Sequence, residues 1–315
     1  MFRLPIEVVC IYGTTVCYII GSHQTPNRYK FMRSIAISNQ KGGVGKTTTA
    51  ANLGACVAEL GKKVLLLDMD PQANLSIHLD AEARRGTPST YTLIQEEDSF
   101  EEVRRPTPVE DLDIIPSNID LAGLEIELSA RSEGREKALK QALEGPAEDY
   151  DYLFIDCPPS LGLLTLNSMC LAREVFIPLQ TEFFALQGLG QLVETVRLVR
   201  SRLNPRLEVT GIIASMFDVR TSLAIEELEE IKSHFGDRVF DTVVRKNVRL
   251  AEAPSFGQPI TGYDTTCYGT EDYRSLAREV TAMSGEWVEV PIEDDAAPPL
   301  PEAMEGETEL ATAKR

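Results

Sequence analysis

The sequence reads Lys41-Gly42-Gly43-Val44-Gly45-Lys46-Thr47-Thr48 shortly after its regular patterning begins at Arg33. This stretch stands between an apolar run over 34–38, which favours a buried strand, and residues 47–60, which favour a helix ending at Gly61. Glycines let a backbone wrap a phosphate with its N–H groups pointing inward, and the N-terminus of the next helix adds its positive end. The order of strand, loop and helix therefore predicts a phosphate-binding loop.

The residue types in this loop indicate a nucleotide and a metal ion. Lys46 is placed to reach the β- and γ-phosphates, and the Thr47 hydroxyl is placed to ligate Mg²⁺. The usual pattern G-x-x-x-x-G-K-[ST] is not fully met, because Gln40 stands where its first glycine belongs and a second lysine, Lys41, opens the loop. We expect ATP and Mg²⁺ as cofactors, bound by the whole loop from Lys41 to Thr48.

Carboxylates follow two further apolar runs. Asp156 follows the run over 152–155, where it can hold a water molecule on Mg²⁺. Asp70 lies just after the run over 64–67 and just before Pro71, where a carboxylate can orient or deprotonate the attacking water. Asp68 could be the metal partner instead of Asp156, and spacing does not separate the two.

Apolar runs and helical periodicities alternate along the rest of the chain. Strands are predicted at Leu112 to Ile115, Tyr152 to Ile155, Val175 to Ile177, Val209 to Ala214 and Val239 to Val244. Helices are predicted over most of Leu121 to Leu143, at Leu186 to Leu203, at Leu223 to Phe235 and at Glu271 to Met283. This alternation predicts an α/β fold, a doubly wound and mostly parallel sheet flanked by helices on both faces.

Composition sets the class and the domain limits. The chain has 315 residues, 43% of them hydrophobic and 25% charged, which excludes collagen-like, wholly disordered and multi-span membrane proteins. We expect one compact domain at 32–285, an extension outside the fold at 1–31 and a disordered acidic tail at 286–315. The apolar run over 8–20 is too short to cross a bilayer. Whether translation starts at Met1 or Met32 stays open.

The net charge of −18 is unevenly spread. Residues 94–149 carry sixteen acidic and six basic side chains, whereas residues 197–249 carry ten basic and eight acidic ones. An anionic partner should therefore meet the second stretch. The first is most simply a solvated surface, with a docking site for a basic partner segment as the alternative.

Four motifs in order carry a resemblance to a known family. They are Lys41 to Thr47, Asp68-Met69-Asp70-Pro71-Gln72, Ile155-Asp156-Cys157-Pro158-Pro159-Ser160, and Asn247-Val248-Arg249-Leu250-Ala251-Glu252-Ala253-Pro254-Ser255. The first is the deviant Walker A signature of a P-loop NTPase. Over about residues 32–284, the chain resembles the ParA/Soj-type chromosome or plasmid partitioning ATPases.

The resemblance implies a cytoplasmic, nucleoid-associated ATPase that forms a homodimer around two ATP molecules. In that dimer Lys41 would reach the partner's phosphates, and Lys41, Lys46 and Asp70 would be the catalytic residues. The ATP-bound dimer would bind double-stranded DNA without sequence preference, and a ParB-type centromere-binding protein would stimulate hydrolysis and reset the cycle, driving segregation.

The resemblance also implies positions for DNA and adenine. Arg220 and Arg249 match the family's DNA-binding arginines, and Arg245 and Lys246 add to the same patch. Where the family usually has Pro-Arg-Asn near the adenine, this chain has Arg245-Lys246-Asn247, so Asn247 is the weaker candidate for an adenine contact.

Other functions remain as alternatives. A MinD-like ATPase that cycles on membranes needs a basic amphipathic C-terminal helix, whereas this terminus is acidic and rich in proline, and we expect no membrane partner. An iron–sulfur electron carrier needs paired cysteines, but the six cysteines include no C-x-x-C pair. A polarity or scaffold protein that binds ATP without useful hydrolysis is not excluded by sequence.

Overall fold

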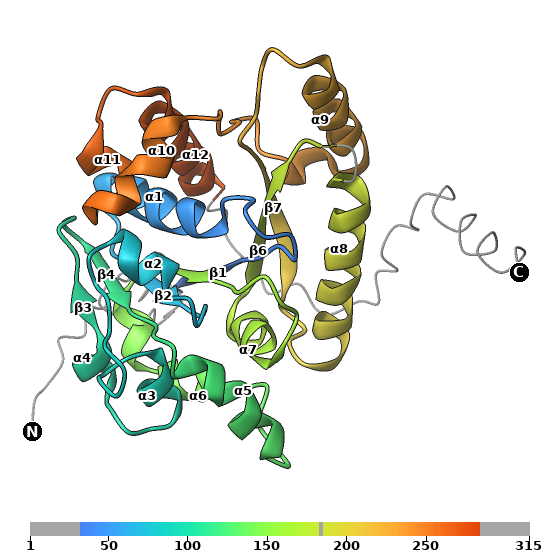
Figure 1. Cartoon of the computed structure of the whole chain (residues 1–315). Coiled ribbons are helices and arrows are strands. Elements are labelled where there is room, and N and C mark those ends of the chain that lie inside the picture. Colours follow the sequence, from blue (N-terminus) through green and yellow to red (C-terminus); the bar gives the residue numbers. More distant parts are fainter. Residues whose placement is uncertain (1–31, 183–184, 284–315) are drawn as a thin grey trace, which may run out of the picture. The chain divides into compact units, whose positions relative to one another are not determined.

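A computed structural model describes residues 32–182 and 185–283, and the predictions for 1–31 and 286–315 lie outside them. The described residues up to Thr281 belong to one compact unit built on a seven-stranded sheet (Figure 1). The strands are β1 (Arg33–Ile37), β2 (Val64–Asp68), β3 (Arg105–Pro106), β4 (Leu112–Ile115), β5 (Tyr152–Asp156), β6 (Glu174–Gln180) and β7 (Glu208–Ser215).

The strand order is β3-β4-β2-β5-β1-β6-β7, and every neighbouring pair except β3·β4 is parallel. The predicted mostly parallel, doubly wound sheet is confirmed. The antiparallel β3 was not predicted, since it is only two residues long and one of them is Pro106. A proline has no backbone N–H to donate to a neighbouring strand. It is therefore tolerated at the edge of a sheet, where a strand has a neighbour on one side only.

Helices cover both faces of the sheet (Figure 1). They are α1 (Lys46–Glu59), α2 (Asn74–His78), α3 (Thr90–Ile94), α4 (Phe100–Val103), α5 (Leu121–Ala130), α6 (Ala138–Leu143), α7 (Leu163–Leu171), α8 (Ala185–Arg202), α9 (Ser222–Phe235), α10 (Val248–Glu252), α11 (Ile260–Tyr263) and α12 (Tyr268–Ala282). Successive strand side chains point to opposite faces. In β1, Ile35 and Ile37 join the core under α1 and α12, while Ala36 joins the core under α5 to α8.

Two predicted elements differ in the structure. The helical stretch over 121–143 is two helices, α5 and α6, separated at Gly134, whose φ of +72° a helix does not allow. The strand predicted over 239–244 is wrong, because only isolated bridges at Val239 and Arg245 follow the edge of β7. Between them, the Thr242 backbone N–H donates to the carboxylate of Glu279 on α12 instead of to the sheet.

The carboxyl ends of the parallel strands meet at one edge of the sheet. The loop after β1 contains the glycine-rich stretch, β2 ends at Asp68, and β5 ends at Asp156. The loops after β6 and β7 reach the same edge from the other side of β1. In open α/β sheets this edge is where ligands bind.

Candidate functional site

The glycine-rich loop has the backbone that its residues predict. Gly43 has a φ of +75°, and Gly45, the residue before α1, has a φ of +88°, both in the region that favours glycine. A Cβ atom built on Gly42 or Gly43 would meet nothing within 4 Å. The loop therefore faces open space directly in front of the N-terminus of α1, as an anion-binding loop requires.

Two polar side chains hold this loop, one just after β1 and one at the end of β7. Asn39 Nδ2 donates to the carbonyl oxygen of Pro178 on β6 at 2.8 Å, and its Oδ1 accepts from the backbone N–H of Lys41 at 3.0 Å. Ser215, at the end of β7, donates its hydroxyl to the Val44 carbonyl oxygen at 2.8 Å. Sequence reasoning missed Asn39 and Ser215, although each stands at the carboxyl end of a buried parallel strand.

Lys46 lies folded back under the loop. Its side chain is buried, and Nζ donates to the carbonyl oxygen of Lys41 at 3.3 Å. Burial lowers the pKa of this ammonium, while attraction to Asp156, Cys157 and Asp70 opposes the shift. A phosphate at the loop would give this buried cation the counter-charge that the loop carbonyl supplies only in part.

Thr47 and Asp156 are in direct contact. The Thr47 hydroxyl donates to Asp156 Oδ2 at 2.7 Å, and Asp156 Oδ1 is buried without a hydrogen-bond partner among the described residues. Burial raises the pKa of Asp156 well above its ordinary value, and the nearby Asp68 raises it further. A buried carboxylate with an unused oxygen beside a hydroxyl is a donor set that suits Mg²⁺.

Asp68 is bound differently. Its Oδ2 accepts from the backbone N–H and the hydroxyl of Ser76 at 2.9 and 2.7 Å, and its Oδ1 accepts from the backbone N–H of Asp70 at 3.1 Å. Burial raises its pKa to about 6, against the lowering effect of these hydrogen bonds. Both Asp68 oxygens thus hold the turn after β2 in place, whereas within residues 32–182 and 185–283 one Asp156 oxygen has no partner.

Asp70 reaches the same edge as the loop. It is 9% exposed, and its Oδ1 accepts from the backbone N–H of Gln72 at 2.9 Å. The neighbouring Met69 backbone N–H donates to the Asp156 carbonyl oxygen at 3.0 Å, which brings the turn after β2 beside the end of β5. Asp70 is also close enough to Lys46 to act on its charge.

Lys41 points away from this buried group. Its Nζ donates to Glu182 Oε2 at 2.6 Å, and both side chains are more than half exposed. Glu182 lies just after β6 and was not singled out by sequence reasoning.

The structure brings two of the predicted DNA-binding residues into adjacent loops. Phe217 and Arg245 form a parallel bridge, which places the loop bearing Arg220 beside the segment bearing Lys246. Arg220 is 84% exposed and pairs with Asp218 at 2.7 Å. Arg249, on α10, pairs with Glu252 at 2.9 Å and stays half exposed.

Arg245 and Asn247 have structural partners of their own. The Arg245 guanidinium pairs with Asp272 and Glu271 on α12 and lies 4.4 Å from the centre of the Tyr268 ring. Asn247 Oδ1 accepts from the backbone N–H of Arg249 and caps α10. The Arg245 contacts attach this segment to α12, and the Asn247 contact fixes the start of α10.

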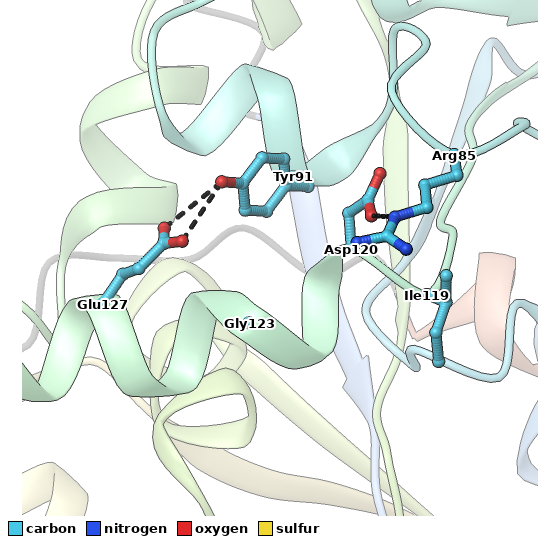
Figure 2. A pocket seen from close by; sticks show the side chains of 6 residues that line it. All are labelled: Arg85, Tyr91, Ile119, Asp120, Gly123 and Glu127. Carbon is cyan, nitrogen blue, oxygen red and sulfur yellow. Dashed lines mark hydrogen bonds and ion pairs between the residues drawn. The ribbon is translucent and has the colours of Figure 1, made fainter.

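A separate pocket of about 300 Å³ lies in the acidic stretch, between α3 and α5 (Figure 2). Arg85 donates to Asp120 at 2.9 Å on one side, and the Tyr91 hydroxyl donates to Glu127 at 3.2 Å on the other. Ile119, 56% exposed, forms part of the lining. Arg85 and Asp120 thus pair as opposite charges, whereas the Glu127 carboxylate accepts from a neutral hydroxyl, and the predicted docking of a basic segment stays a prediction.

Neither a membrane span nor a cysteine framework occurs in the part of the chain that the structure describes. No helix there is long and apolar enough to cross a bilayer. The cysteines there are free thiols, of which Cys56, Cys157 and Cys170 are buried.

Comparison with known proteins places this geometry in a family. A family model described as an AAA domain matches residues 32–209. The chain is 50% identical over 248 residues to the sporulation initiation inhibitor protein Soj of Bacillus subtilis, covering 79% of this chain and 98% of that protein. It is 48% identical over 254 residues to the chromosome partitioning protein ParA of Caulobacter vibrioides, covering 79% and 94%.

Solved structures share the fold. Cobyrinic acid a,c-diamide synthase from Mycobacterium smegmatis, with bound ATP analog and magnesium, is 34% identical at a TM-score of 0.69, covering 80% of this chain and 95% of that one. The cell division ATPase MinD of Pyrococcus furiosus, 23% identical at a TM-score of 0.66, covers 81% and 100% and supports the fold alone. Its sequence relatives show that the chain belongs to the Soj/ParA family of chromosome-partitioning ATPases, and the glycine-rich loop at the sheet edge agrees with this.

Proposed function

We propose that this chain is an ATP-switched partitioning protein whose ATP-bound homodimer binds DNA without sequence preference, in the cytoplasm on the nucleoid. A ParB-type protein then stimulates hydrolysis and releases the dimer. The contact between Thr47 and Asp156 in front of the glycine-rich loop carries the ATP- and Mg²⁺-dependent part of this proposal, because it joins a hydroxyl to a buried carboxylate whose other oxygen has no partner among the described residues. The Soj and ParA relatives support the partitioning role.

The loop residues fit ATP and Mg²⁺. Backbone N–H groups from Gly42 to Thr48 would surround the phosphates, and Lys46 would exchange the Lys41 carbonyl oxygen for a phosphate oxygen. Thr47 would ligate the metal directly, with Asp156 behind it holding a metal-bound water. Bound Mg²⁺ would neutralise charge on the β- and γ-phosphates. The relative at 34% identity, which holds an ATP analog and magnesium, supports this assignment.

Hydrolysis needs a group that positions water. Asp70 stands at the same edge as the loop, and its carboxylate would orient or deprotonate the attacking water. Lys41 would supply a cation to the phosphates of the partner subunit, which stabilises charge that develops in the transition state. Dimerisation would then depend on the γ-phosphate.

The basic surface would form from Arg220, Lys246 and Arg249, and its duplication in a dimer would double the phosphate contacts. Arg245 would support that surface from behind, through Asp272, rather than contact DNA. Asn247, already capping α10, would remain the candidate for an adenine contact through its amide nitrogen.

Retention of a random-sequence DNA duplex by the purified protein tests the switch. We expect binding with Mg²⁺-ATP, little with Mg²⁺-ADP or without nucleotide, and loss of binding in Arg220→Glu. Arg85→Glu is the matched control, since Arg85 is also 84% exposed and also pairs with one aspartate, Asp120.

Each outcome of the DNA retention assay supports or contradicts the proposal. Binding that depends on ATP and decreases with salt supports the proposal. Equal or absent binding in every nucleotide state contradicts it and favours a scaffold or a membrane-cycling protein, which co-sedimentation with liposomes in ATP would then separate. Equal loss in Arg85→Glu would show that net charge, not this surface, governs retention.

A further inference from the structure

The contact between Lys41 and Glu182 joins two loops that the sheet forces together. β1 and β6 are parallel neighbours, with Ile37 opposite Phe176, so the loops that follow them leave the sheet side by side. Asn39 fixes the β1 loop to β6 by donating to the Pro178 carbonyl oxygen. The place of Glu182 beside Lys41 is therefore set by strand pairing.

Glu182 is also held by its own backbone. Its N–H donates to the Gln180 carbonyl oxygen at 2.9 Å, and its carbonyl oxygen accepts from the N–H of Ala185, the first residue of α8, at 2.8 Å. Its side chain, which is 63% exposed, takes no part in these bonds. The Glu182 backbone is thus fixed next to the glycine-rich loop, from where its carboxylate reaches Lys41.

We propose that Glu182 is a positioning residue that holds the ammonium of Lys41 on its own subunit and so opposes the ATP-dependent dimer. The proposal rests on the proposed function, in which Lys41 reaches the partner's phosphates. An ammonium 2.6 Å from a carboxylate of its own chain must leave it before it can bind phosphate across the interface. Each dimerisation event then breaks two such pairs, one in each subunit.

The expected change in dimer affinity follows from the solvent exposure of the Lys41–Glu182 ion pair. Because one exposed ion pair changes an equilibrium by about 1.5- to 5-fold and the dimer loses two, Glu182→Gln should tighten the Mg²⁺-ATP dimer by about 2- to 25-fold. The gain should shrink in roughly 1 M salt, which screens exposed charges.

Sedimentation over a range of protein concentrations, with Mg²⁺-ATP and with Mg²⁺-ADP, measures this. Asp241→Asn is the matched control, since Asp241 forms an exposed ion pair with Lys232 at 2.9 Å on α9, and it should leave the dimer unchanged. An unchanged or weaker dimer in Glu182→Gln, with the wild type dimerising normally, overturns the inference and leaves the proposed function standing. A wild type that does not dimerise with ATP contradicts the proposed function itself.

A second readout does not depend on dimer formation. In the nucleotide-free protein, the labelling rate of Lys41 by an amine-acylating reagent should rise in Glu182→Gln, because its nitrogen is no longer occupied by the carboxylate. The labelling rate of Lys63 serves as the internal reference. Unchanged Lys41 labelling means that Glu182 does not restrain the ammonium and overturns the inference.

Discussion

Asp68 and Asp156 stand opposite each other in the register of β2 and β5, so two buried carboxylates end adjacent strands. The two carboxylates differ in their hydrogen bonds, and this difference indicates a different role for each. Asp68 is bound on both oxygens by Ser76 and by the backbone of Asp70, while Asp156 contacts Thr47 and has one oxygen with no partner in the part of the chain that the structure describes. This difference separates the two candidates that spacing left equal, and it favours Asp156 as the group behind the metal.

Asp156→Asn tests this assignment. Removing one of two adjacent buried charges should raise the melting temperature of the nucleotide-free protein at pH 8, by about 3 °C. The same variant should lose the further stabilisation that Mg²⁺ adds to ATP. Thermal unfolding with ATP and EDTA against ATP and Mg²⁺ measures both effects.

Asp68→Asn is the control for Asp156→Asn, because it removes the paired carboxylate on the neighbouring strand. It should weaken the turn after β2, yet keep a response to Mg²⁺. A lost Mg²⁺ response in Asp68→Asn together with a kept response in Asp156→Asn would reverse the assignment.

The sequence pattern predicts which loops lie at the carboxyl edge of the sheet, but few of the contacts between their side chains. Strand–loop–helix order at 33–60 predicts where a phosphate binds, because glycine conformation and helix direction are local properties. Asn39, Ser215 and Glu182 could not be assigned in the same way, because their contacts depend on which strands become neighbours. The strand predicted over 239–244 was wrong for the same kind of reason, since Glu279, distant in sequence, binds the Thr242 backbone N–H.

Asp218→Asn should strengthen DNA binding. Asp218 holds the Arg220 guanidinium through Nε at 2.8 Å and through a terminal nitrogen at 2.7 Å, and these bonds lower the pKa of the Asp218 carboxyl. Without the carboxylate, Arg220 is available to phosphate, and the affinity for a random duplex with Mg²⁺-ATP should rise several-fold with a steeper salt dependence. Asp120→Asn, which releases Arg85, is the control. Weaker binding in Asp218→Asn would mean that the ion pair positions Arg220 for DNA.

His78 should make the stability depend on pH. Its ring is buried, its Nε2 has no partner among the described residues, and burial lowers its pKa to about 4. The unfolded chain binds a proton near pH 6.5 and the folded chain does not, so His78 lowers the stability as pH falls from about 6.5 to about 4, by up to about 3 kcal/mol.

Asp68 changes the stability with pH in the opposite direction, so the effect of His78 is measured against the variant His78→Gln. Its raised pKa, about 6, makes the folded state gain stability as pH falls through 6. The difference in unfolding free energy between wild type and His78→Gln cancels this shared contribution. Denaturant unfolding at several pH values should show the wild type losing stability relative to His78→Gln below pH 6.5, and parallel curves would contradict the prediction. His234→Gln makes the same substitution at an exposed site.

A chain that begins at Met32 should fold and should bind ATP and DNA as the full chain does. Arg33 starts β1 and makes a buried ion pair with Glu174, so the first contact that fixes the sheet lies inside the shortened chain. Circular dichroism and the DNA retention assay on residues 32–315 measure this. Loss of folded protein would show that residues 1–31 belong to the fold.

Arg33→Met should destabilise that same fold strongly. Arg33 donates to both oxygens of Glu174 and to the Val280 carbonyl oxygen on α12, so it joins β1, β6 and the last helix. Removing it leaves the buried Glu174 carboxylate with the neutral donor Thr210 among the described residues, at a cost of about 3–5 kcal/mol in unfolding free energy. Because that cost comes from the unpaired charge, replacing both residues by Met should recover most of it. A double variant as unstable as Arg33→Met would instead place the cost in the lost contact with α12.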